Sequence, residues 1–338
     1  MNRSHLFPWM LTSAFALSVA MGSTPNYAVL KKIPLGGDGG WDYLTADSAS
    51  HRLYLSRGTH VQVLDTQSEK LVGDIANTPG VHGIALNKKM GLGYTSNGRE
   101  NSVTVFDLKT LKETDRIKIE GRNPDAILFD SSTNRVFTFN GQSQDVTAID
   151  ATTNKVVGTI KVNGKPEFPQ ADGKGTIFVN IEDTSEVQQI DAKNLKVTKT
   201  WKIAPAEGPS GMAIDVKGHR IFSVCDGAMA ISDTQAGKLL QTVKIGDGPD
   251  AAAFDSAYGV ALSSNGGDGT LSVVAKGKDG TYQTVQTVTT QKGARTMALD
   301  PKTHLIYLID AEFGQAAAGA RRPPMKPNSA FLIVVGPK

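Results

Sequence analysis

Residues 135–160 read RVFTFNGQSQDVTAIDATTNKVVGTI, in which three short apolar runs are separated by two polar turns. Within the runs, β-branched and aromatic side chains alternate with polar or small ones, and Gly, Asn and Asp occupy the turns. This period of two is typical of strands, and no part of the chain shows a sustained apolar stripe with the period of a helix. The stretch therefore predicts consecutive antiparallel strands joined by tight turns.

The same pattern recurs along most of the chain. One apolar run in each repeat ends in an acidic or amide residue, and these ends are 40 to 45 residues apart: Asp47, Asn87, Asp130, Asp172, Asp215, Asp255 and Asp300. A second run ends in an aspartate every 41 to 43 residues: Asp65, Asp107, Asp150, Asp191 and Asp233. Four strands per repeat, in seven repeats, predict an all-β fold, a seven-bladed β-propeller of four-stranded blades. A β-solenoid and an array of small sandwiches are the alternatives.

The two ends of the chain indicate how the ring closes. After Asp300 the chain supplies two apolar runs and ends at Lys338 without an outer strand. Residues 27–33 resemble the outer strand at 199–203, so we predict that the N-terminal strand closes the last blade and hides two strand edges. Residues 21–338 would then form a single β-propeller domain, although a chain of 338 residues would otherwise suggest two domains.

Residues 1–20 have the features of an export signal. Arg3 precedes the apolar stretch 6–20, which is shorter than the roughly 20 residues of a spanning helix. The sequence SVA at 18–20 fits a cleavage site with small residues. We therefore predict a signal peptide over residues 1–20, a periplasmic or secreted protein, and no membrane span after cleavage. A retained N-terminal anchor is the alternative.

Composition excludes several classes of function. The 36 Lys and Arg residues nearly balance the 33 Asp and Glu residues, which makes a nucleic-acid partner unlikely because such proteins usually carry a basic field. The single cysteine, Cys225, excludes a disulfide framework, an iron–sulfur cluster and a covalently attached c-type haem. It ends an apolar run and is interpreted as a buried strand residue. We expect a monomer and assign no cofactor.

Propeller topology assigns the loops to faces. Loops that lead into the innermost strands share a face with the loops that join second and third strands, while the hairpins between first and second strands lie on the opposite face. His51, His219 and His304 fall in such hairpins and are interpreted as turn residues. His82 lies in PGVHG (79–83), which leads into an innermost strand. We call the face that carries it the His82 face.

Polar residues in the corresponding loops of the other repeats should surround the channel mouth on that face. The candidate ligand-binding residues are Trp41, Asp42, His82, Asn123, Asp125, Glu167, Ser210, Asp250 and Arg295. Such a set suits a small polar ligand or general acid–base catalysis. The alternative is that these loops use polar residues because tight turns need them. No two members show the spacing of a known metal motif, so no metal ligand is assigned.

A segment at residues 311–329 interrupts the last repeat on the same face. It contains the basic pair Arg321 and Arg322, which we add to the ligand-binding candidates, together with Lys326. Its prolines predict an extended backbone without strand pairing. The segment would be a lid or a clamp for an anionic ligand or partner, or a loop without function.

Three stretches resemble the YVTN-repeat (YncE-like) propeller family: YTSN at 94–97, IDATTNKVV at 149–157 and GPDA at 248–251. The resemblance covers essentially the whole chain after the signal peptide. It departs from the family pattern at KPEFP (165–169) and in the segment before the last strand. The resemblance implies an exported seven-bladed propeller, in a family whose members mostly lack an assigned reaction.

Two functions are compatible with these residues. The first is an exported binding or scaffolding propeller that presents its channel mouth to a small polar or anionic ligand or to a protein partner. The alternative is a hydrolase or lyase in the channel, similar to propeller lactonases, with or without the assistance of a metal ion. In that case His82 and a carboxylate such as Asp125, Glu167 or Asp250 would be the acid and base. A quinone-dependent dehydrogenase is not favoured, because the tryptophan-rich eight-bladed pattern is absent.

Overall fold

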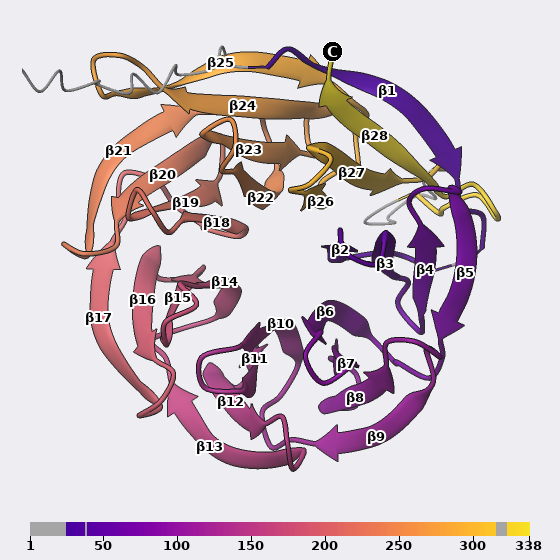
Figure 1. Ribbon diagram of the computed structural model, residues 1–338. Coiled ribbons are helices and arrows are strands. Elements are labelled where there is room, and N and C mark those ends of the chain that lie inside the picture. The colour runs from indigo at the N-terminus through magenta and orange to yellow at the C-terminus, as the bar shows by residue number, and fades with distance from the viewer. Residues whose placement is uncertain (1–24, 38, 316–322) are drawn as a thin grey trace, which may run out of the picture.

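The computed structural model describes residues 25–37, 39–315 and 323–338. The predicted signal peptide and the pair Arg321 and Arg322 lie outside these described residues. Within them, 28 strands form seven four-stranded antiparallel sheets arranged as a ring, and all regular secondary structure is β (Figure 1). The predicted fold class is therefore confirmed.

The strands of each blade follow one another from the channel outward. The innermost strands are β2 (Leu44–Asp47), β6 (Val81–Asn87), β10 (Pro124–Asp130), β14 (Pro166–Ala171), β18 (Met212–Asp215), β22 (Pro249–Asp255) and β26 (Met297–Asp300). The second strands are β3 (Arg52–Ser56), β7 (Leu92–Asn97), β11 (Arg135–Asn140), β15 (Thr176–Ile181), β19 (Arg220–Cys225), β23 (Val260–Asn265) and β27 (Leu305–Asp310).

The third strands and the outer strands complete the blades. The third strands are β4 (Val61–Asp65), β8 (Ser102–Asp107), β12 (Asp145–Asp150), β16 (Glu186–Asp191), β20 (Ala228–Asp233), β24 (Thr270–Lys276) and β28 (Phe331–Pro337). The outer strands are β5 (Lys70–Ile75), β9 (Glu113–Lys118), β13 (Lys155–Lys161), β17 (Lys196–Lys202), β21 (Lys238–Lys244), β25 (Tyr282–Thr289) and, in the last blade, β1 (Tyr27–Pro34).

The N-terminal strand closes the ring as predicted. Strand β1 pairs antiparallel with β28, from Tyr27 opposite Pro337 to Pro34 opposite Phe331, so that the last sheet combines both ends of the described chain (Figure 1). Ile33 of this strand is 6% exposed and joins the core between the last blade and the first. Closure therefore satisfies the hydrogen bonds of both strands and buries apolar surface across the seam.

The repeat markers owe their regular spacing to turn chemistry. Asp150, at the end of β12, accepts hydrogen bonds from the backbone N–H groups of Thr152 and Thr153 at 2.9 and 2.8 Å. Aspartate side chains favour such turns because they replace a backbone acceptor. In the hairpins after the innermost strands, the predicted turn residues His51, His219 and His304 all adopt a positive φ, between 56° and 60°. Their interpretation as turn residues is confirmed.

The blades pack face to face through apolar side chains. Phe137 and Phe139 of β11 lie in one core with Ile177 and Val179 of the next blade, and all four are fully buried. Cys225 is buried in the neighbouring core, and burial raises the pKa of its thiol to about 12. The cysteine is therefore a buried strand residue, as predicted, and is not poised as a nucleophile.

Two outer strands approach the next blade at a glycine. A Cβ placed on Gly73 of β5 would lie 2.6 Å from Cδ1 of Leu111, which comes from the turn before β9. Gly158 of β13 has the same relationship to Leu195, at 2.5 Å. Glycine at these positions leaves the space that the leucine side chain of the neighbouring blade fills.

The segment before β28 differs in part from its prediction. Phe313 and Met325 form an isolated antiparallel bridge, Gly314 N–H donates to the carbonyl of Pro324 at 2.8 Å, and Lys326 N–H donates to Glu312 at 2.8 Å. The expectation of an extended backbone without pairing was therefore wrong at the base of the segment. Proline lacks an N–H donor, but its carbonyl can still accept.

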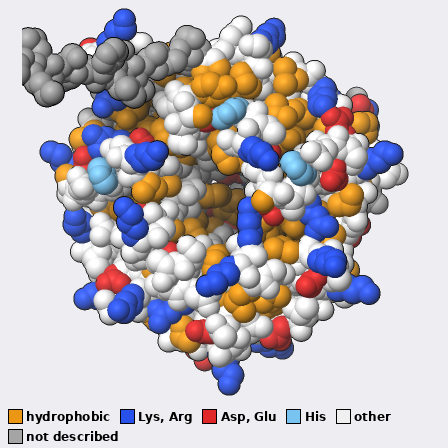
Figure 2. Space-filling view, viewed as in Figure 1, with side chains coloured by type: hydrophobic (Ala, Val, Ile, Leu, Met, Phe, Trp, Pro, Cys, Tyr) orange, Lys and Arg blue, Asp and Glu red, His pale blue; other side chains and the backbone are white. Residues whose placement is uncertain are grey.

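The surface carries charges of both signs. Figure 2 shows the hollow at the centre of the ring, with Lys and Arg side chains spread around the rim among acidic ones. Basic and acidic side chains are interspersed over the face in view, with no single basic field there. The described part of the chain contains no helix with the length and hydrophobicity that crossing a bilayer requires.

Candidate functional site

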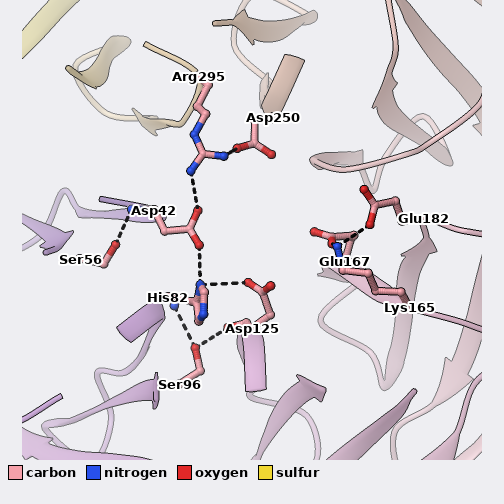
Figure 3. A network of polar contacts seen from close by, with 11 residues as sticks. Asp42, Ser56, His82, Ser96, Asp125, Lys165, Glu167, Glu182, Asp250 and Arg295 are labelled. Atoms are coloured by element: carbon pink, nitrogen blue, oxygen red, sulfur yellow. Dashed lines mark hydrogen bonds and ion pairs between the residues drawn. The ribbon is translucent and has the colours of Figure 1, made fainter. Parts of the chain in front are cut away.

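Every blade supplies one residue at the same position of its repeat, near the start of its innermost strand. This residue stands five positions before the repeat marker: Asp42, His82, Asp125, Glu167, Ser210, Asp250 and Arg295. Because the innermost strands surround the channel, residues about one repeat apart become neighbours (Figure 3). We call these seven residues the mouth ring.

Three members of the mouth ring form a cluster. His82 Nδ1 lies 2.6 Å from Asp42 Oδ2 and 3.6 Å from Asp125 Oδ1 (Figure 3). Among the described residues, this group places one potential ligand atom of each side chain within 4.8 Å of the other two. The sequence analysis assigned no metal ligands because the three residues stand in different repeats and make no local motif.

Arg295 connects this cluster to Asp250 in the sixth blade. Its Nη1 lies 2.6 Å from Asp250 Oδ2, and its Nη2 lies 3.9 Å from Asp42 Oδ1 (Figure 3). Asp42 belongs to the first blade and Arg295 to the last. The arginine therefore links the charged residues across the seam of the ring.

Glu167 has its own cationic partner. Lys165 Nζ lies 2.5 Å from Glu167 Oε1 and also forms an ion pair with Glu182 (Figure 3). Burial disfavours the charged ammonium group, but the hydrogen bonds to Glu167 and Glu182 outweigh that effect and raise the pKa of Lys165. Lys165 thus remains positively charged and neutralises part of this side of the mouth.

Burial and crowding perturb the carboxyl groups of the ring. Burial and the charge of Asp125 raise the pKa of Glu167 from 4.5 to about 8. Burial raises the pKa of Asp250 to about 6 despite the nearby Arg295. The pKa of Asp125 is likewise raised, first by burial and then by Asp42, although His82 opposes the shift. Carboxylates forced together in a partly dry site favour a bound proton or another cation.

The pKa of His82 is also raised, but for a different reason. Burial alone would lower its pKa, but the hydrogen bond to Asp42 and the charges of Asp125 and Glu167 raise it overall. In the network of Figure 3, five acidic groups (Asp42, Asp125, Glu167, Glu182 and Asp250) face three basic ones (His82, Lys165 and Arg295). This excess of acidic groups favours a cationic ligand over an anionic one.

Several supporting residues were missed by the sequence analysis. The backbone N–H of Asp42 donates to Ser56 Oγ at 2.9 Å, and Ser96 Oγ accepts from Gly83 N–H at 2.9 Å while donating to the carbonyl of Asp125 (Figure 3). Ser56 and Ser96 both stand nine positions after a repeat marker, a shared offset that could have identified them.

Tyr43 and Gly98 also shape the cluster. Tyr43 lies near Asp125, whose charge acts on its hydroxyl group. Burial and the surrounding carboxylates hold the pKa of Tyr43 well above its usual value, so that it remains a donor. A Cβ on Gly98 would lie 2.8 Å from His82 Nε2. The absence of a side chain at residue 98 therefore makes room for the imidazole.

Two cavities adjoin the mouth ring. One, of about 350 Å³, is lined by Trp41, Asp42, His82, Asn123 and Arg295, among others. The structure thus brings five of the sequence-predicted candidates to one cavity. Asp125, Glu167 and Asp250 do not line this cavity, but they face the same channel mouth (Figure 3).

The second cavity, of about 380 Å³, is mostly apolar. It shares Trp41 and Arg295 with the first and adds Phe313 and Met325 from the segment before β28. The rings of Trp41 and Phe313 have their centroids 6.3 Å apart. Ser210 has a different role, because its hydroxyl donates to the carbonyl of Pro249 at 3.2 Å and connects two blades.

The similarity of the chain to known proteins lies in the fold. No protein-family model matches the sequence, and no curated protein matches it either. A chain of Kuenenia stuttgartiensis hydrazine synthase is similar in structure, with a TM-score of 0.70 and 17% identity over 87% of this chain and 96% of that one. A chain of the mitotic checkpoint complex has a TM-score of 0.75 and 11% identity over 98% of both chains. At these identities the likeness establishes a seven-bladed β-propeller fold and nothing finer.

Proposed function

We propose that the protein is an exported binding propeller of the YVTN (YncE-like) type, whose mouth ring binds a small, positively charged ligand. The propeller fold is compatible with binding or scaffolding in general, so the specific function is argued from the site, which would be the mouth ring. Export is supported by the pattern of residues 1–20, and the family by the stretches at 94–97, 149–157 and 248–251.

The observation that carries this proposal is the convergence of Asp42, Asp125, Glu167 and Asp250 on the channel mouth (Figure 3), where Asp42 also lines the cavity of about 350 Å³. Like charges in a partly buried site repel one another, and burial raises the pKa of three of these groups. A folded protein retains such an arrangement at a cost in stability, and a bound cation would relieve it. The apolar second cavity, next to Trp41, would hold a nonpolar part of the same ligand.

The charge preference is testable by thermal shift. The protein lacking residues 1–20, in EDTA, is titrated with an alkylamine, a diamine and arginine, and separately with phosphate and citrate. We expect stabilisation by at least one of the cations and none by the anions. Asp250→Asn should weaken the cation effect, while Asp279→Asn, an exposed turn residue outside the mouth ring, should leave it unchanged. Stabilisation by the anions alone would contradict the proposal.

A second candidate, a hydrolase or lyase, is favoured by one observation. Glu167, with a pKa of about 8, is a carboxylic acid at neutral pH, and His82 on the same mouth is held by a carboxylate. Glu167 would then be the proton donor, and His82 the proton acceptor. The test is a screen of esters and lactones with the wild type, His82→Gln and Glu167→Gln. Turnover that both variants retain in full would exclude this assignment.

A further inference from the structure

We propose that Asp42, His82 and Asp125 bind a divalent first-row transition-metal ion, with Zn²⁺ and Mn²⁺ as the principal candidates. The inference rests on the proposed function in placing cation binding at the mouth ring, and it deepens that function by naming the class of cation. The metal site uses three of the seven ring positions, contributed by three consecutive blades.

The geometry of the three side chains carries the proposal. Nδ1 of His82 lies between two carboxylate oxygens, at 2.6 Å from Asp42 and 3.6 Å from Asp125, and the three ligand atoms lie within 4.8 Å of one another. Ligands bonded to one metal ion at about 2.0 to 2.2 Å are separated by distances of this order. Small side-chain rotations would therefore bring all three atoms to a common ion.

The chemistry of the ligands selects the metal. One imidazole nitrogen and two carboxylate oxygens suit zinc, manganese and similar ions, whereas Ca²⁺ and Mg²⁺ prefer sites made only of oxygen. Three protein ligands also leave coordination positions free for water or a further ligand. The cavity of about 350 Å³ that Asp42 and His82 line would provide the space for it.

A second set of contacts orients the ligands. Ser56 of β3 accepts a hydrogen bond from the backbone N–H of Asp42, and Ser96 of β7 donates one to the backbone carbonyl of Asp125. Metal ligands are typically held by outer hydrogen bonds, which fix their orientation before the ion binds. The two serines come from different strands and hold the backbone of two of the three ligands.

The most direct test is calorimetric titration of EDTA-treated protein lacking residues 1–20. We expect the wild type to bind one equivalent of Zn²⁺ or Mn²⁺, and to bind Ca²⁺ more weakly. His82→Gln, Asp42→Asn and Asp125→Asn should each weaken binding by at least about tenfold, the lower limit for changes even in outer-shell partners. Circular dichroism checks that each variant is folded.

A matched control is available on the opposite face. His304 Nδ1 lies 2.8 Å from Asp255 Oδ2, which reproduces the His–Asp contact without a third ligand. His304→Asn, which suits the positive φ of 60° at that position, should leave metal affinity unchanged. Equal losses in His82→Gln and His304→Asn, or no metal binding by the wild type, would overturn the inference.

The inference and the proposed function can fail separately. If organic cations stabilise the protein in EDTA but no metal binds, the metal site is wrong and the proposed function stands. If metal binds and the organic cations have no effect, the inference stands and the ligand is the metal alone. Should the three variants fail to fold, the visible spectrum of Co²⁺ bound to the wild type decides: weak octahedral bands identical to those of Co²⁺ in buffer would overturn the site.

Discussion

His82 Nδ1 lies 2.6 Å from Asp42 Oδ2, although 40 positions separate the two residues in the chain. That separation is one repeat, so the contact joins the same ring position in adjacent blades. In a propeller, residues that stand one repeat apart in the sequence become neighbours around the channel. Residues that lack any local motif can therefore form one site.

The raised pKa of Glu167 predicts a pH-dependent effect on stability. Between pH 4.5 and about 8, the folded protein keeps a proton that the unfolded chain has released, so stability falls as the pH rises through this window. Glu167→Gln should remove this loss and stabilise the protein at pH 9, by up to about 5 kcal/mol, with little effect at pH 4. Denaturant titrations at the two pH values measure the difference.

Glu186 provides a control, because its pKa is shifted in the opposite direction from that of Glu167. Burial opposes its ionisation, but hydrogen bonds from Lys202, Asn163 and Thr184 lower its pKa overall. Its contribution to stability is therefore present above the usual carboxyl range and lost in acid. Glu186→Gln should destabilise the protein at pH 9. The interpretation of Glu167 would be wrong if both variants changed stability in the same direction.

Gly98 should control the position of the His82 imidazole. In Gly98→Ala the new Cβ would lie 2.8 Å from His82 Nε2. We expect the ring to move away from Asp42, and the pKa of His82 to fall because its main raising contact weakens. An NMR titration of the imidazole measures the pKa. Gly40→Ala, where a Cβ would meet no atom within 4 Å, should leave the titration unchanged.

Strand β1, which closes the ring, should stabilise the protein mainly through the side chains that it buries. Ile33→Ala removes a side chain that is 6% exposed in the core of the closing blade, and should cost about 2 to 4 kcal/mol. Leu30→Ala, on the same strand but 46% exposed, should cost about 1 kcal/mol or less. Thermal unfolding of both variants compares them, and similar losses would show that the strand is not docked as described.

Gly73 and Leu111 lie in contact between neighbouring blades, so substitutions at the two positions should have coupled effects on stability. Gly73→Ala should destabilise the protein by about 1 to 3 kcal/mol, because its Cβ would collide with Leu111. In the double variant with Leu111→Ala, the collision is relieved. The double variant should therefore be more stable than the sum of the two single effects predicts. Additive losses would count against a direct contact between the two residues.

The repeat made most of the fold predictable. Asp47, Asp150 and their equivalents bind the backbone of the turn that follows them, so they mark where strands end. The closing strand was predictable because residues 27–33 have the pattern that the last blade lacks. The fold was predictable because it depends on local hydrogen bonds and on a fixed repeat period, and both can be recognised in the sequence.

The site was predictable only in part. The repeat places Asp42, His82 and Asp125 on one face, but their distances depend on side-chain torsions that no local pattern specifies. Pairing of Arg295 with Asp250, and its approach to Asp42, depends on which charges are present at neighbouring ring positions. Contacts of this kind depend on the three-dimensional arrangement of all seven blades, which no local sequence pattern specifies.

The seam between the last blade and the first has a consequence for folding. Arg295 lies near Asp42 only after β1 has paired with β28, because those two residues stand on opposite sides of the closing joint. An open chain of correctly folded blades would still lack this contact, and Asp42 would lack its guanidinium neighbour. Completion of the ring and maturation of the binding site are therefore one event, and ligand affinity would report on whether a molecule has closed.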